Sequence, residues 1–190
     1  MTDKKTIRTQ IKCKTLAMSQ AERLREAENV VERLKQYVST LRPKVLAMFY
    51  PLSDEIDILP IAEFVHTSGG RVVMPRMECG GESRMEFYDF YAEQTSSGSF
   101  GVMEPQAGEP IGVEQIDLMI VPGVAFTSQG ERLGRGKGYY DRYMAREGFR
   151  AQTIGVCFAH QLLLTLPIET HDRRVDMVVS GVSRELNENL

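Results

Sequence analysis

Short apolar runs separated by helix-like segments constrain the fold of this chain more than any other feature. Residues 44–50, KVLAMFY, form a near-continuous apolar run that leads into a proline. A run of this length is typical of a strand buried on both faces, as in a parallel sheet. Further strands are predicted at residues 71–75, 83–90, 116–122 and 151–158.

The first part of the chain predicts two consecutive helices. Residues 4–18 can form the first, and SQAE at 19–22 matches a capping box, with Ser19 as the N-cap and Glu22 returning to its amide. The second helix should end before the Arg-Pro pair at 42–43. An apolar stripe at helical spacing predicts the face that this helix buries, and it consists of Leu24, Ala27, Val31, Leu34 and Val38.

Two shorter helices complete the predicted pattern. One covers residues 56–70 and is closed by two glycines, and the other lies around residues 139–147. Strands that alternate with helices imply right-handed crossovers and a sheet covered on both sides. We therefore predict an α/β fold in one domain, residues 1–190, with a mostly parallel twisted sheet and helices on both faces in a Rossmann-like, three-layer arrangement.

The balance of charge and the cysteine content limit the function classes. With 23 Lys and Arg against 26 Asp and Glu, the net charge of −3 creates no overall field that favours nucleic acid or an anionic membrane. The N-terminus lacks the apolar core of a signal peptide, and no run approaches the roughly 20 apolar residues of a membrane span. Cys13, Cys79 and Cys157 form no CxxC pair, which argues against a disulfide framework and a thiolate zinc site. We predict a soluble protein of the reducing cytoplasm.

Three polar segments follow predicted strands directly and should open on one rim of the sheet. They are residues 51–55, 75–77 and 122–141. Ligands of parallel α/β sheets bind beyond the carboxyl ends of the strands, so we expect the functional site at this rim.

The most informative of these segments contains RLGRGKGYYD at residues 132–141. It is not a Walker-type phosphate loop, because Gly138 stands where Ser or Thr would hold magnesium, nor a dinucleotide fingerprint, because Tyr139 stands where glycine is required. Its glycines can nevertheless bring backbone amides close to oxygen atoms, and its three cations add charge-assisted donors. The carboxylate of Asp141 could replace the missing hydroxyl as a magnesium ligand. The alternative is a mobile surface loop without a ligand.

The longer segment 121–144, VPGVAFTSQGERLGRGKGYYDRYM, resembles the signature of the 5-formyltetrahydrofolate cyclo-ligase family, also called methenyltetrahydrofolate synthetases. The likeness extends over nearly the whole chain, and supporting segments occur in the same order. These are Lys4 with Arg8, Glu55 within SDEID, MPR at 74–76 and HDRRVD at 171–176.

The resemblance implies an ATP- and magnesium-dependent ring closure, in which 5-formyltetrahydrofolate becomes 5,10-methenyltetrahydrofolate and ADP and phosphate are released. In this scheme the formyl oxygen attacks the γ-phosphate of ATP, and nitrogen 10 of the folate then displaces the phosphate. Such phosphoryl transfer depends on positioning and charge neutralisation, so no protein nucleophile is required. The implied partners are small molecules rather than nucleic acid or membrane, with Mg²⁺ as the metal, and we expect a monomer.

The resemblance also implies roles for individual residues. Arg135 and Lys137 are the implied catalytic residues. The residues implied to bind ATP are Lys4, Arg8, Arg132, Leu133, Gly134, Arg135, Gly136, Lys137, Gly138, Tyr139 and Tyr140. Those implied to bind the folate are Tyr50, Glu55, Arg135, Gly136, Lys137, Gly138 and Tyr139. Asp141 and Asp172 are implied to hold magnesium, with Asp176 as the alternative to Asp172.

Each of these assignments competes with a plainer interpretation. Tyr50 at a strand end could be core packing, one of the paired tyrosines could simply fill space beneath the loop, and Asp172 could form an ion pair with a neighbouring arginine. The chain as a whole could be a non-catalytic nucleotide-binding or sensor module on the same scaffold. RNA binding through RGKGYYDR is disfavoured by the net charge and by the lack of an aromatic strand platform.

Overall fold

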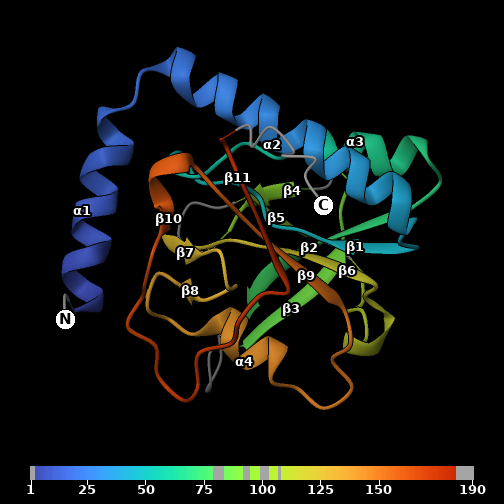
Figure 1. Cartoon of the computed structure of the whole chain (residues 1–190). Helices are drawn as coiled ribbons and strands as arrows, with labels where there is room; N and C mark the ends of the chain where they lie inside the picture. The colour runs from blue at the N-terminus through green and yellow to red at the C-terminus, as the bar shows by residue number, and fades with distance from the viewer. Residues whose placement is uncertain (1–2, 79–83, 92–94, 99–102, 107, 183–190) are drawn as a thin grey trace, which may run out of the picture.

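A six-stranded sheet forms the centre of the computed structural model, which describes residues 3–78, 84–91, 95–98, 103–106 and 108–182 (Figure 1). Its strands lie in the order β11-β9-β6-β1-β2-β3, and every neighbouring pair is parallel except β2 with β3. The predicted α/β fold with a mostly parallel sheet is confirmed. The strand bounds are β1 (Val45–Ala47), β2 (Arg71–Glu78), β3 (Arg84–Asp89), β6 (Leu118–Val121), β9 (Gln152–Cys157) and β11 (Met177–Ser180).

Four α-helices accompany the sheet within the described residues. They are α1 (Lys4–Ala17), α2 (Gln20–Leu41), α3 (Pro60–Thr67) and α4 (Tyr139–Met144). The predicted capping box is present at the start of α2: Ser19 accepts a hydrogen bond from the amide of Glu22, whose carboxylate accepts one from the amide of Ser19. The third predicted helix was too long, because α3 begins at Pro60, where proline suits the first helical turn.

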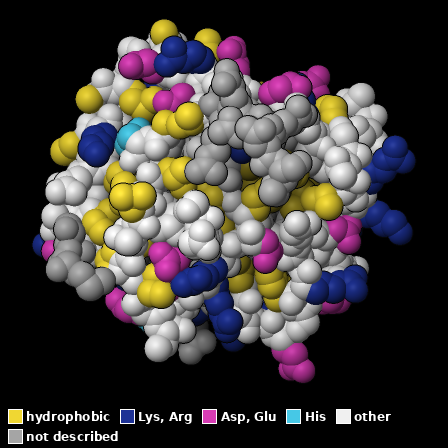
Figure 2. Space-filling view, in the orientation of Figure 1, with side chains coloured by type: hydrophobic (Ala, Val, Ile, Leu, Met, Phe, Trp, Pro, Cys, Tyr) yellow, Lys and Arg dark blue, Asp and Glu magenta, His cyan; other side chains and the backbone are white. Residues whose placement is uncertain are grey.

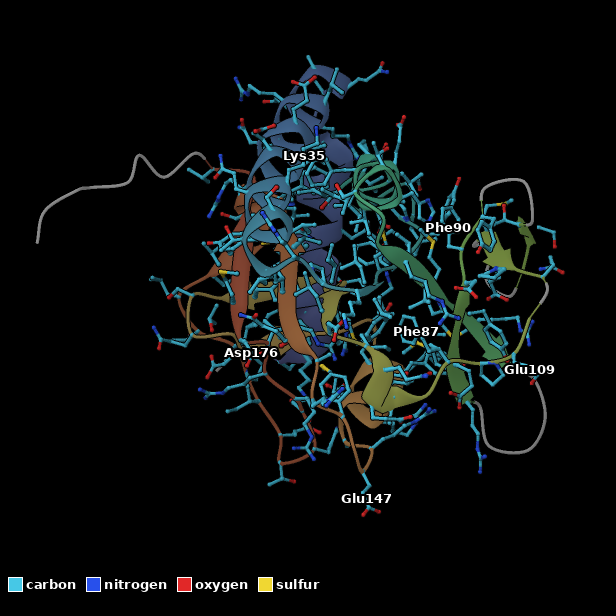
Figure 3. The ribbon with its side chains drawn as sticks, turned by 90° about the vertical axis from the view of Figure 1, so that its right-hand side faces the viewer. Lys35, Phe87, Phe90, Glu109, Glu147 and Asp176 are labelled. Carbon is cyan, nitrogen blue, oxygen red and sulfur yellow. The ribbon has the colours of Figure 1, made fainter. Side chains whose placement is uncertain are left out.

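The elements form three layers. In Figure 1, α2 and α3 lie above the sheet and α4 below it, while α1 stands at one side. Figure 3 gives the view at 90°, with Lys35 of α2 and Glu147, just after α4, on opposite sides of the sheet. Successive residues of β6 pack on opposite sides of the sheet. Ile120 belongs to the apolar cluster that includes α2 and α3, and Val121 belongs to the cluster that includes α4.

One prediction about α2 was wrong. Leu24 was placed on the buried stripe but is 60% exposed. The buried residues of α2 begin only at Ala27, and before this point the helix contacts the rest of the protein through polar side chains, as when Arg23 donates to the carbonyl oxygen of Ser53. The other members of the predicted stripe, Ala27, Val31, Leu34 and Val38, are buried.

Several short elements were not predicted from the sequence. They are β4 (Thr95–Ser97), β5 (Met103–Pro105), β7 (Ala125–Thr127), β8 (Arg132–Leu133), β10 (Leu162–Leu163), the edge strand β11, and two 3₁₀ helices, η3 (Val113–Gln115) and η4 (Ala159–Gln161). Strands β10, β7 and β8 form a separate small sheet that carries the glycine-rich segment. Apolar residues of α1 pack on it, in a cluster that contains Ile7, Ile11 and Leu133.

The surface carries both signs of charge. Figure 2 shows Lys and Arg side chains interspersed with Asp and Glu side chains over the visible face. Within the described residues, no helix combines the length and the apolar character that a membrane crossing requires.

Candidate functional site

A cavity of about 320 Å³ opens where the predicted polar segments leave the sheet. Tyr50 follows β1, Met77 lies in the last part of β2, and Gly123 follows β6, and all three line this cavity. The glycine-rich loop closes it from the other side. The carboxyl ends of these parallel strands therefore meet at one rim, as predicted.

The glycine-rich loop adopts backbone conformations that require glycine. Gly136 has φ 100° and Gly138 has φ 67°, in the left-handed region that other residues adopt only with strain. Arg8 of α1 lies against this loop: its Nε donates to the carbonyl oxygen of Gly134 at 2.8 Å, and its guanidinium lies 3.6 Å from where a Cβ on Gly136 would be. The N-terminal helix is thus attached to the loop, as the assignment of both to one site requires.

Arg135 connects the loop to the acidic segment on the opposite side of the cavity. Its Nη2 donates to Asp54 Oδ1 at 2.6 Å and to Glu55 Oε1 at 3.0 Å. The other oxygen of Glu55 accepts a hydrogen bond from the amide of Leu52 at 3.0 Å. Arg135, implied to bind both ATP and the folate, and Glu55, implied to bind the folate, are therefore partners of one another in this structure.

Burial and charge act in opposite directions on this acidic pair. Burial raises the pKa of Glu55 above its ordinary value, and the positive charge of Arg135 offsets only part of that effect. Burial also opposes ionisation of Asp54, but its hydrogen bonds with Arg135 and the charge of that residue hold the pKa below its ordinary value. Asp54 was not among the predicted site residues, and its position next to Glu55 in SDEID is the sequence signal that could have identified it.

The two tyrosines of the loop have different environments. Tyr139 is half-buried and lines the cavity, with the guanidinium of Arg142 5.3 Å from its ring centre. The hydroxyl of Tyr140 is buried in the cavity wall and has no hydrogen-bond partner among the described residues. Burial, together with the nearby charge of Glu55, raises the pKa of Tyr140. A buried hydroxyl without a partner costs free energy, so this group is available for a ligand.

The side chain of Arg132 is buried beneath the glycine-rich loop rather than exposed to solvent. Its side chain is 3% exposed, and its Nη2 donates to Asp141 Oδ1 at 2.7 Å. The cation of Arg132 therefore orients the carboxylate of Asp141. Leu133 is also buried, and its side chain packs with Ile7 and Ile11 of α1.

The predicted metal ligands Asp141 and Asp172 lie on adjoining segments. The amide of Arg173 donates to Asp141 Oδ1 at 3.0 Å, which brings the segment after Asp172 against α4. Asp172 Oδ2 accepts from Lys4 Nζ and from the amide of Glu169, both at 2.7 Å. Hydrogen bonds reach one oxygen of each carboxylate, and the other oxygen has none from the described residues.

This donor set fits magnesium bound together with a nucleotide. No group of three or more His, Cys, Asp or Glu side chains suited to a metal occurs among the described residues, and the predicted site consists of the two carboxylates of Asp141 and Asp172. Magnesium commonly takes one or two carboxylates and completes its shell with phosphate and water. Arg132 and Lys4 form ion pairs with the two carboxylates and orient them.

Asp176 has a structural role instead. Its Oδ2 accepts hydrogen bonds from the amide and the hydroxyl of Thr153, at 2.8 and 2.7 Å, and its own amide donates to that hydroxyl. These contacts join the start of β9 to the segment before β11. Of the two alternatives, the geometry favours Asp172 as the ligand.

Two other predicted residues occupy mixed positions. Tyr50 packs against the main apolar cluster and also lines the cavity, so its position is compatible with both interpretations. Lys137 is exposed and lines the cavity, and no hydrogen bond from the described residues involves its ammonium group.

Comparison with known proteins finds the same family in each case. A model of the 5-formyltetrahydrofolate cyclo-ligase family matches residues 1–181. The mouse 5-formyltetrahydrofolate cyclo-ligase is 26% identical in an alignment 188 positions long, gaps included, which covers 93% of this chain and 92% of the mouse protein. The solved structure of 5,10-methenyltetrahydrofolate synthetase from Aquifex aeolicus is 32% identical with a TM-score of 0.81, covering 94% of this chain and 89% of that one. The synthetase from Mycoplasma pneumoniae, 24% identical, shares the fold with a TM-score of 0.77 over 93% of this chain and 98% of its own.

Proposed function

The chain belongs to the 5-formyltetrahydrofolate cyclo-ligase family, and from this premise we propose that it couples the cyclisation of 5-formyltetrahydrofolate to the hydrolysis of ATP. The products are 5,10-methenyltetrahydrofolate, ADP and phosphate. One observation carries the proposal. Glu55 and the glycine-rich loop line the cavity, and Arg8 lines a smaller neighbouring hollow that shares Arg135 with it, although these residues are far apart in the sequence.

The apolar side of the cavity suits the pterin ring. Phe49, Tyr50, Met77 and Tyr139 line it and offer flat or flexible apolar surfaces. The carboxylate of Glu55 accepts hydrogen bonds from the amino and ring N–H groups of the pterin. The unpartnered hydroxyl of Tyr140 supplies a further hydrogen-bonding group on the same wall.

The glycine-rich side suits the triphosphate. Backbone amides of the loop, with Lys137, Arg135 and Arg8, neutralise charge on the phosphate oxygens. The formyl oxygen forms a bond to the γ-phosphorus as the bond to ADP breaks. Nitrogen 10 then attacks the formyl carbon and loses its proton, and phosphate leaves with the former formyl oxygen. The residues of the cavity hold the two substrates in line for the first step.

Asp141 and Asp172 are the residues that would hold Mg²⁺. When bound, the ion neutralises negative charge on the nucleotide phosphates. Arg132 and Lys4 fix the orientation of the two carboxylates.

We further propose that residues 1–190 act as a single catalytic domain, as a monomer, in the cytoplasm. Cys13 is exposed and Cys157 buried, and both are free thiols, in keeping with a reducing compartment. Cys79 lies outside the described residues.

Mixing the protein with ATP, magnesium and 5-formyltetrahydrofolate tests the proposed function. We expect absorbance of the methenyl product to grow in step with ADP release, and to require all three components. A non-catalytic nucleotide-binding module would bind ATP without forming this product. RNA binding that weakens steeply with salt, in place of turnover, would favour the RNA alternative.

A further inference from the structure

Arg135 lies on the boundary between the cavity and the smaller hollow beside it. The hollow has a volume of about 130 Å³, and Arg8 and Lys12 of α1 line one of its walls. Of these two spaces, Glu55 lines the cavity and Asp54 lines the hollow, whereas Arg135 lines both. The two acids that pair with Arg135 therefore belong to different spaces.

The guanidinium of Arg135 is shared unequally between these two acids. Both oxygens of Asp54 take part, because Nη2 donates to Oδ1 at 2.6 Å and Nη1 donates to Oδ2 at 3.2 Å. Glu55 uses one oxygen, Oε1, which accepts from Nε and Nη2 at 3.1 and 3.0 Å. A pair that involves two oxygens and two nitrogens fixes the plane and the direction of a guanidinium, so Asp54 orients Arg135.

In the proposed function, Glu55 has a second use for the same oxygen. Its Oε2 already accepts a hydrogen bond from the amide of Leu52 at 3.0 Å. The N–H groups of the pterin and those of Arg135 therefore compete for Oε1. If Arg135 had Glu55 as its only partner, folate binding would leave its charge unpaired. Because Asp54 binds a different edge of the guanidinium, Arg135 can give up Glu55 and still be held in place.

The two carboxyl groups also differ in how firmly they keep their charge. Burial opposes the ionisation of both, but the hydrogen bonds and the charge of Arg135 hold the pKa of Asp54 below its ordinary value, and the charge of Lys12 acts in the same direction. Burial raises the pKa of Glu55, and the like charge of Asp54 adds to this effect. Asp54 is therefore the more firmly ionised partner of Arg135.

We propose that Asp54 is a positioning residue, which holds Arg135 at the boundary so that Glu55 is released to the folate and the Nε edge of the guanidinium to a phosphate oxygen. This inference rests on the proposed function, since it takes Glu55 to bind the pterin and Arg135 to bind phosphate. Asp54 acts only through Arg135 and contacts neither substrate.

A double-mutant cycle tests this role, with the Kd for 5-formyltetrahydrofolate measured by calorimetry without ATP. Asp54→Asn keeps the size of the side chain but removes its charge, so Arg135 pairs more strongly with Glu55 and competes with the pterin. We expect Kd to rise by about threefold to fivefold. In protein that already carries Arg135→Gln, the same substitution should leave Kd unchanged, because the residue through which Asp54 acts has been removed.

Turnover gives a second measurement. Asp54→Asn should lower kcat by about tenfold, since Arg135 is no longer aimed at the transferring phosphate. Asp54→Glu keeps the charge and should recover part of both losses. Asp57→Asn is the matched control: Asp57 is an exposed acid of the same segment, it accepts a hydrogen bond from the amide of Leu59, and its substitution should change neither Kd nor kcat.

The outcomes separate this role from the proposed function. Normal Kd and kcat in Asp54→Asn, or an equal rise in Kd with and without Arg135, would overturn the role of Asp54 even if the unmodified protein forms the methenyl product. Folate binding that follows the cycle, in a protein that forms no product, would refute the proposed function and leave Asp54 as the residue that positions Arg135.

Discussion

Lys137 provides the simplest test of the glycine-rich loop at the scale of a single residue. It is exposed and lines the cavity, so its removal disturbs little of the packing. Loss of one charge-assisted contact to a transferring phosphate costs about 3 kcal/mol, or roughly a hundredfold in rate. We expect Lys137→Ala to lower kcat by about that factor with Tm unchanged, as measured by the methenyl assay and thermal unfolding. Lys44→Ala, at an exposed lysine before β1, is the control, and near-normal turnover in Lys137→Ala would contradict the assignment.

The metal assignment can be tested by titrating magnesium at saturating ATP. Asp141→Asn and Asp172→Asn should each raise the magnesium concentration needed for half-maximal rate by about tenfold, since each removes one anionic ligand. Asp176→Asn should instead lower the free energy of unfolding, because Asp176 holds Thr153 rather than a ligand. A shift of the magnesium curve in Asp176→Asn alone would reverse the choice between Asp172 and Asp176.

The raised pKa of Glu55 predicts that folate binding depends on pH. Its raised pKa means that it gains a proton at a higher pH than an ordinary glutamate. The carboxylate is the form that accepts hydrogen bonds from the pterin, so the KM for the folate should rise as the pH falls through this raised pKa. Glu55→Gln should show a high folate KM at every pH, with a much smaller change in the KM for ATP. An unchanged pH profile in Glu55→Gln would show that another group is responsible.

The candidate site residues could be named from the sequence, but the residues with which they form ion pairs and hydrogen bonds could not. The glycine-rich loop stands out because its residue types have few structural uses together. The sequence contains no sign that Arg135 pairs with Asp54 and Glu55, or that Arg132 is buried beneath Asp141. Such pairings depend on how segments far apart in the chain meet.

At the scale of elements, we expect the packing of α1 on the rest of the protein to depend on pH. Thr15 near its end lies 2.8 Å from His160 Nε2, and the pKa of His160 is lowered by burial and by the charges of Lys14 and Arg23, against the opposing charge of Glu26. When α1 is packed on the protein, the pKa of His160 is below its ordinary value of 6.5. The stabilisation of α1 is therefore fully present above pH 6.5, and it is lost as the pH falls through the lowered pKa. We expect amide protection in α1 to decrease in that window, measured by hydrogen exchange corrected for its intrinsic pH dependence.

The variant His160→Gln serves as the control for α1. Glutamine can still form a hydrogen bond with Thr15 but does not titrate. Protection of α1 should then be independent of pH over the same window. The same loss of protection in this variant would assign the effect to another group.

The long helices were predicted, but several of the shortest strands were not. Helix α2 has a capping box and a long apolar period, and both were recognised. Strands β7, β8 and β10 have two or three residues each, too few to show a period, and apolar residues of α1 pack on the sheet that they form.

At the scale of the whole molecule, the sequence predicted the layers but not the way α1 closes the site. The parallel sheet followed from the apolar runs and the crossover rules. The docking of Arg8 on Gly134 joins positions 126 residues apart. It depends on the fit of Ile7 and Ile11 against the small sheet, which only the three-dimensional arrangement shows.

The central claim is that the formyl group of the folate and the γ-phosphate of ATP react directly in this one site. Labelling the formyl oxygen of 5-formyltetrahydrofolate with ¹⁸O tests it most directly, with the released phosphate analysed by mass spectrometry after a single turnover. We predict that the label appears in phosphate, in an amount equal to the methenyl product formed. Unlabelled phosphate, with the heavy oxygen recovered in water, would contradict the account.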